Sequence, residues 1–120
     1  MTAPNLKNPT IITGKTARVG IATTSVVGIL TNSAASNKVL KINSIFAANV
    51  SGTTAADISV SIYNGSSDTY LAYTISVPPD ATQIISTKET YFYLEESDSI
   101  RAIAGTSNAI SVVVGYEEIS

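Results

Sequence analysis

Apolar and polar residues alternate along most of the chain, and Gly, Pro, Asn and Asp interrupt the alternation about every ten residues. Alternation with a period of two is the pattern of β-strands that bury one face. The run from Asp57 to Tyr63 shows it most clearly, because Ile58, Val60 and Ile62 are predicted to point inward and the residues between them outward. Short strands at this spacing favour a sandwich or a barrel.

The pattern predicts eight or nine short strands and no convincing helix. In chain order the strands are expected at residues 16–22, 25–30, 39–50, 57–63, 70–77, 83–86, 91–94, 99–104 and 109–119. Parallel sheets need helical crossovers, so we expect antiparallel sheets. We therefore predict an all-β fold, a single-domain antiparallel β-sandwich of the jelly-roll type.

In two strands the alternation also predicts which side chains share a face. In the longest strand the shared face is expected to comprise Leu40, Ile42, Phe46, Ala48 and Val50, with Ser44 among them. In the strand at 70–77 it is expected to comprise Leu71, Tyr73, Ile75 and Val77.

The first fourteen residues differ from the rest of the chain. Pro4 and Pro9 exclude a helix or a central strand there. We predict two parts, an extended N-terminal arm at residues 1–14 and a β-sandwich domain at 15–120. The arm has two interpretations, a frayed tail with a short edge strand or an arm that packs on a neighbouring subunit.

Candidate protein-interface residues come from the arm and from one hairpin. Leu6, Ile11 and Ile12 are too apolar for a purely solvated tail. Tyr63 and Tyr70 flank the same loop and are both predicted to face away from the apolar stripe. Exposed tyrosine favours interfaces because it offers a large rigid surface with a polar tip, although the pair is equally compatible with cross-strand stabilisation of the hairpin.

The composition lacks several of the residue types on which catalysis commonly depends. The chain has no histidine and no cysteine, which removes the usual proton shuttle, thiolate metal sites and any disulfide scaffold. Charged residues make up 13% of the chain, and 16 Ser and 15 Thr supply most of the polar surface. The seven basic residues are scattered, so nucleic-acid binding is not expected. We predict no enzyme activity, no catalytic residue, no cofactor and no metal.

The carboxylates Glu95, Glu96 and Asp98 form the one acidic cluster in the sequence. A calcium site or a pair of glycosidase carboxylates is conceivable there, but we favour a solvated turn, because no recognised calcium loop is complete and tryptophan is absent. The start of the chain lacks a secretory pattern, and the longest apolar stretch is too short to span a bilayer. We therefore expect no membrane partner.

Six segments spread over nearly the whole chain carry a family resemblance: NPTIITGKTA (8–17), VLKINSIFAAN (39–49), ISVSIY (58–63), LAYTISVP (71–78), YLEESDSI (93–100) and VVGYEE (113–118). In these segments the chain resembles small virion structural proteins of tailed bacteriophages, especially of cyanophages. In such proteins a glycine commonly stands where this chain has Ser97.

The resemblance implies a virion structural protein, most simply a capsid decoration (cement) protein that binds the outer head surface and stabilises it. Its partner would be the major capsid protein, and a homo-oligomer is expected, with a trimer favoured. It would be made in the host cytoplasm and would end on the capsid surface of the virion. The alternatives are a neck or tail structural component, or a carbohydrate- or host-surface-binding β-sandwich module. No catalytic residue is implied by the resemblance.

Overall fold

The computed structural model describes Pro4 and residues 6–120, and β-strands make up 59% of these residues. Within the described part, the helical content is a single 3₁₀ turn, η1 (Lys88–Thr90). The strands are β1 (Ile12–Ile21), β2 (Val27–Thr31), β3 (Val39–Asn49), β4 (Ala56–Tyr63), β5 (Asp68–Val77), β6 (Thr82–Ser86), β7 (Phe92–Leu94), β8 (Ser99–Ala104) and β9 (Ile110–Ile119). The predicted all-β fold of about nine strands is confirmed.

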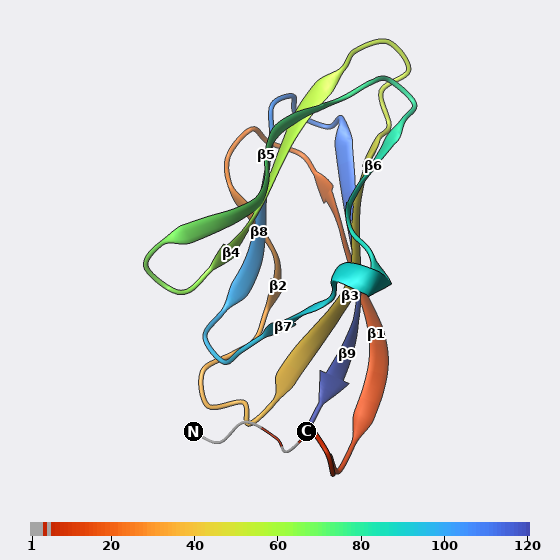
Figure 1. Cartoon of the computed structure of the whole chain (residues 1–120). Helices are drawn as coiled ribbons and strands as arrows, with labels where there is room; N and C mark the ends of the chain where they lie inside the picture. Colours follow the sequence, from red (N-terminus) through yellow and green to blue (C-terminus); the bar gives the residue numbers. More distant parts are fainter. Residues whose placement is uncertain (1–3, 5) are drawn as a thin grey trace.

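The strands form two antiparallel sheets that face each other (Figure 1). Sheet A has the order β1-β9-β3-β6, with β7 pairing with the other half of β3, and sheet B has the order β2-β8-β4-β5. The chain passes back and forth between the sheets, so each sheet collects strands that are distant in sequence. The predicted antiparallel sandwich is confirmed, and the finer jelly-roll assignment stays a prediction.

The core lies between the two sheets and is almost wholly aliphatic. Ile42 and Ile45 reach it from sheet A, and Ile58, Val60 and Ile100 reach it from sheet B, all without solvent exposure. Fully burying one such side chain stabilises the fold by roughly 1.5–3 kcal/mol. The inward face predicted for β4 is therefore correct at Ile58 and Val60.

A β-bulge in β3 reverses the alternation halfway along the strand. The pairing of β3 with β9 shifts between Ile42 and Ser44, so Ile42 and Ile45 are both buried although they lie three residues apart. Phe46 consequently lies on the outer face of sheet A. The prediction that Phe46 and Ala48 share the face of Ile42 was wrong, because one extra residue moves every later side chain to the other face.

The edge strand β5 contains two such irregularities relative to β4. Ala72 and Val77 are buried, whereas Leu71 and Tyr73 are exposed. The prediction that Leu71 and Tyr73 share a face with Val77 was wrong for the same reason.

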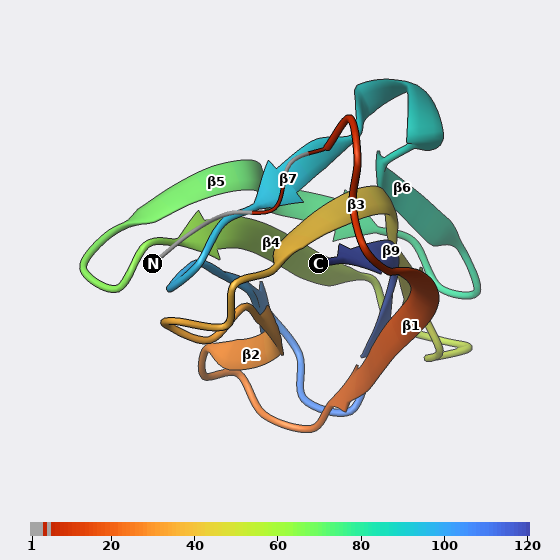
Figure 2. The same cartoon turned by 90° about the horizontal axis from the view of Figure 1, so that it is seen from below.

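The N-terminal segment is tied to the C-terminus at one end of the sandwich (Figures 1 and 2). The backbone N–H groups of Thr10 and Ile11 donate to the carbonyl of Ser120 at 2.7 and 3.1 Å, and the Ser120 N–H donates back to Ile11 at 2.9 Å. The predicted boundary after residue 14 falls inside β1, whose Ile12 already pairs with β9. Residues 1–3 and 5 of the predicted arm lie outside the described residues.

Candidate interaction surfaces

Two tyrosines of β5 lie side by side on the outer face of sheet B. The ring centroids of Tyr70 and Tyr73 are 4.8 Å apart, and the rings meet edge to face at 71°. Residues three apart in a regular strand point to opposite faces. Here the register shift opposite Ser61 makes Leu71 an extra residue, so Ala72 turns inward and Tyr73 turns outward.

The second irregularity of β5 fixes this arrangement at Thr74. Thr74 has φ +48°, a left-handed conformation that is unusual for a β-branched residue. Its backbone N–H donates to the Oγ of Ser59 on β4 at 2.9 Å. Strain of this kind amounts to roughly 1–3 kcal/mol and often accompanies a functional surface.

A stacked arginine forms the polar centre of the same face. The guanidinium of Arg101 lies 3.8 Å from the ring centroid of Tyr63. It also donates twice to Asp68, from Nε to Oδ1 at 3.1 Å and from Nη2 to Oδ2 at 2.6 Å, while Ser61 donates to Oδ1 at 2.8 Å. The hydrogen bond from Arg101 lowers the pKa of Asp68, and the same bond raises the pKa of Arg101.

We call this surface the tyrosine face and define it as Tyr63, Asp68, Tyr70, Tyr73 and Arg101. Tyr63 and Tyr70 both lie on it, as their predicted outward orientation requires. The sequence analysis missed the other three residues. Arg101 comes from β8, 33 residues from Asp68, and no local pattern indicates which strands become neighbours.

The arm residues lie elsewhere. Leu6, Ile11 and Ile12 are all about half exposed, near the end of the sandwich where the N-terminal segment meets Ser120. The loop between β4 and β5, which joins Tyr63 to Asp68, projects at another level of the molecule (Figure 1). The five predicted interface residues are therefore divided between two separate surfaces.

A third surface is the outer face of sheet A. Val113, Phe46 and Ile84 are directly paired across β9, β3 and β6, and they form a line that we call the apolar row. Phe46 is 36% exposed and Ile84 58%. The rows on either side carry small residues, namely Thr16, Gly115 and Ser44 on one side and Gly20, Ser111 and Ala48 on the other.

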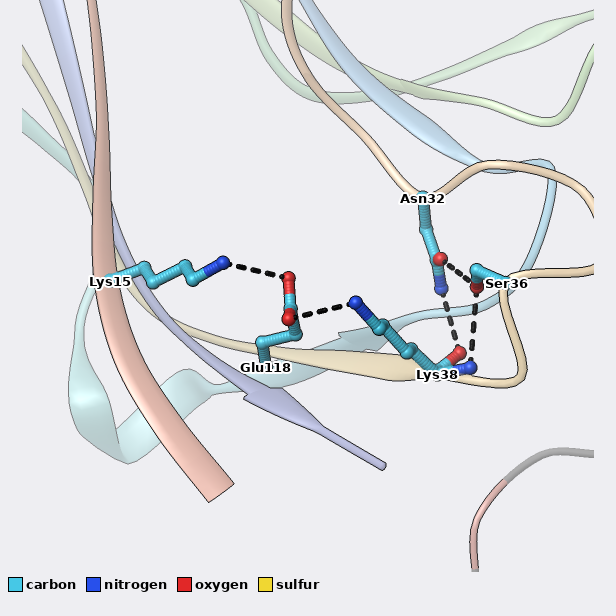
Figure 3. A network of polar contacts seen from close by, with 5 residues as sticks. All are labelled: Lys15, Asn32, Ser36, Lys38 and Glu118. Carbon is cyan, nitrogen blue, oxygen red and sulfur yellow. Dashed lines mark hydrogen bonds and ion pairs between the residues drawn. The ribbon is translucent and has the colours of Figure 1, made fainter. Parts of the chain in front are cut away.

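A polar network closes the sandwich near the termini (Figure 3). The carboxylate of Glu118 accepts from Lys15 Nζ at 3.2 Å and from Lys38 Nζ at 3.0 Å. The Lys38 contact is the main cause of the lowered pKa of Glu118. Asn32 accepts from Ser36 Oγ at 2.6 Å and donates to the carbonyl of Lys38 at 2.9 Å. These contacts tie β1, β9 and the loop before β3 together, and their role is structural.

The acidic turn between β7 and β8 is engaged in local hydrogen bonds. Asp98 Oδ2 accepts from the backbone N–H of Glu95 at 3.3 Å. Glu96 is 7% exposed, and its Oε2 accepts from the N–H of Asn37 at 3.3 Å. Glu96 is therefore not part of a solvated turn, because it packs against the loop before β3. Across Pro4 and residues 6–120, no group of three or more His, Cys, Asp or Glu is arranged to hold a metal ion.

Neither a scan against protein-family models nor a search of curated proteins finds a match for this chain. Among the described residues no helix is long and apolar enough to cross a membrane.

Proposed function

We propose that the chain is a non-enzymatic structural protein of a phage virion, a capsid decoration protein that binds the outer surface of the head. The observation that carries this proposal is the apolar row on the outer face of sheet A, bordered by small side chains. An exposed apolar surface of this kind is stabilised when another protein covers it. The resemblance to small phage virion proteins suggests that the partner is the major capsid protein.

The N-terminal segment and the outer face of sheet A are separate surfaces, and a protein that stabilises a capsid can use two such contacts. A decoration protein stabilises a head when it binds neighbouring capsomers in their assembled arrangement and not the separated subunits. The N-terminal segment with Leu6, Ile11 and Ile12 offers one contact, and the outer face of sheet A offers another. The strand orders of the two sheets support the jelly-roll assignment that accompanies this proposal.

Electron microscopy of purified virions that contain this protein tests the location directly. Density for the chain on the outer head surface supports the proposal, and density in the neck or tail refutes it in favour of the alternative location.

Rebinding to heads stripped of the protein then tests whether the apolar row is the binding surface. Ile84→Asp places a charge in the apolar row, and we expect it to weaken binding at least about tenfold. Val50→Asp is the matched control, because Val50 is similarly exposed but lies outside the row.

We also propose a homo-oligomer, most simply a trimer around a local threefold axis. Val112 and Val114 are buried in the core, whereas Val113 lies on the outer face beside Phe46. A closed ring buries such outer side chains without leaving a free contact surface. Light scattering at roughly tens of micromolar measures the mass. A monomer both in solution and in the density on the head would refute the trimer.

One observation favours a second function, carbohydrate binding. Tyr70 and Tyr73 present an exposed aromatic pair next to the hydroxyl, carboxylate and guanidinium groups of the tyrosine face. Sugars stack their C–H faces on aromatic rings, and their hydroxyls donate to carboxylates and accept from guanidinium groups. NMR titration with neutral monosaccharides and oligosaccharides tests this function. Saturable shifts at Tyr70 and Tyr73 that disappear in Tyr73→Ala support it, and unchanged spectra refute it.

A further inference from the structure

Each of the two sheets has two edges, and the four edges differ in how well their strands are protected against pairing with another chain. Natural edge strands are commonly short or carry β-bulges that distort the row of free backbone groups. In sheet B, β2 has five residues and a register shift, and β5 has two shifts. On one side of sheet A, β6 has five residues with a shift in its pairing and β7 has three residues.

The remaining edge strand, β1, has neither form of protection. It is ten residues long, and it pairs with β9 through ten consecutive residue pairs without a register shift. Figure 2 shows β1 at the margin of its sheet, and β2, the next strand in sequence, belongs to the other sheet. Within the described residues no strand pairs with the outer side of β1.

The pairing determines which backbone groups point away from β9. Ile11 and Ser120 exchange both of their backbone hydrogen bonds, so Ile11 points toward the last strand. In an antiparallel pair, residues that exchange hydrogen bonds alternate with residues whose N–H and C=O point to the other side. The groups that face outward therefore belong to Ile12, Gly14, Thr16, Arg18 and Gly20. They form a regular row along the whole strand.

The charges of β1 indicate what kind of strand fits there. The strand contains Lys15 and Arg18 and no carboxylate. Lys15 is bound to Glu118, whereas Arg18 forms no ion pair among the described residues. Arg18 lies on the outer face beside a shallow hollow of ≈ 280 Å³ between β1 and β9. Opposite charges on directly paired strands are stabilising and like charges are not. A second copy that paired through its own β1 would bring the same two cations and no acidic residue.

We propose that the outer edge of β1 accepts an extended, acidic segment of a partner protein as an additional antiparallel or parallel strand of sheet A. The backbone row supplies the hydrogen bonds, and a carboxylate of the added strand faces Arg18. This proposal rests on the proposed function for the identity of the partner, a capsid protein. The edge chemistry itself is independent of it.

The first experiment uses the isolated protein and a synthetic probe. The probe is a capped ten-residue peptide of alternating Thr and Val with a central Glu, and its control carries Lys in place of Glu. We expect saturable NMR shifts of the amides of Gly14, Thr16 and Arg18, with the Glu peptide binding at least about threefold more tightly. Arg18→Glu should reverse that preference.

Two matched variants separate the backbone from the side chain. Thr16→Pro removes an outward N–H without removing a hydrogen bond to β9, and proline is tolerated at such edge positions. Thr16→Ala keeps the N–H. We expect Thr16→Pro to weaken peptide binding at least about tenfold and Thr16→Ala to stay within about twofold. Circular dichroism checks the fold, and Gly14→Pro replaces Thr16→Pro if that variant does not fold.

The same variants on stripped heads keep the two proposals apart. If the unmodified protein does not bind heads but binds the acidic peptide at β1, the proposed function fails and the edge proposal stands. Equal binding by Thr16→Pro and Thr16→Ala, to peptide and to heads alike, overturns the edge proposal. No saturable peptide shift at β1 up to roughly 1 mM also overturns it. A dimer that Thr16→Pro abolishes overturns the choice of partner, because the occupant is then a second copy.

Discussion

Replacing Thr74 by glycine should stabilise the protein, although it removes a side chain. Thr74 is exposed and has φ +48°, and its side chain makes no hydrogen bond to any of the residues that the structure describes. The backbone N–H of Thr74 donates to Ser59 Oγ, and glycine keeps this bond. The substitution therefore changes the conformational energy of the backbone and little else.

The size of the effect follows from two opposing terms. A left-handed conformation costs an L-residue roughly 1–2 kcal/mol, and a β-branched side chain belongs to the unfavourable end. Glycine in a strand costs about 0.5–1 kcal/mol in chain entropy. The difference is a net stabilisation of about 0.5–1 kcal/mol. For a chain of 120 residues this corresponds to a rise in Tm of roughly 2–5 °C.

Thermal and urea unfolding measure this effect, with Thr74→Ala as the control. Alanine retains the Cβ that makes φ +48° unfavourable, so we expect it to change the stability by less than about 0.5 kcal/mol. Glycine should also loosen the contact between Tyr70 and Tyr73, because it removes the constraint that fixes the bulge. A destabilised glycine variant, or equal stability of the glycine and alanine variants, would show that strain at Thr74 is not what the backbone angle indicates.

Three further substitutions test other parts of the structure. Ser97→Gly should stabilise by up to about 1 kcal/mol, because Ser97 has φ +72° in the turn before β8; an unchanged Tm refutes this. Glu118→Gln should cost about 1 kcal/mol or less at pH 7. The folded pKa of Glu118 is lowered from 4.5, so its stabilisation is present above pH 4.5 and is lost as the pH falls below it, and the glutamine variant should lose less stability on acidification. Asn32→Ala should cost about 2–4 kcal/mol in urea unfolding, because it leaves the carbonyls of Lys38 and Leu94 without their donor.

The strand pattern was predictable because it depends on the local alternation of side chains. Every strand of the structure overlaps a predicted one, and β4 has its inward face as expected. The bulges were not predictable, because an extra residue appears in the sequence only as a break in the alternation of apolar and polar residues. Phe46 and Tyr73 are such cases, since Phe46 was predicted to share a face with Ile42 and Tyr73 with Val77, and both lie on an outer face. Ser97, with φ +72°, is an irregular position that did have an advance signal, the glycine that the resembling proteins commonly carry there.

The candidate surfaces were predictable only where they are local. Tyr63 and Tyr70 flank one hairpin, and their shared orientation follows from the alternation of β4. The ion pair between Asp68 and Arg101 could be predicted only if the pairing of β8 with β4 were known. That pairing joins two segments that are distant in sequence, so no local pattern indicates it. The apolar row likewise exists only because β9, β3 and β6 are neighbours in sheet A.

The two long edge strands, β1 and β5, suit different kinds of contact with a partner. The bulges of β5 interrupt its free backbone row, which makes strand addition there unfavourable. The same bulges bring Tyr73 beside Tyr70, so recognition at that edge must use side chains. The regular pairing of β1 has the opposite consequence, because its backbone row is intact while its outward side chains are mostly small. Recognition at β1 therefore depends on the backbone, with Arg18 as the side chain that selects among partners.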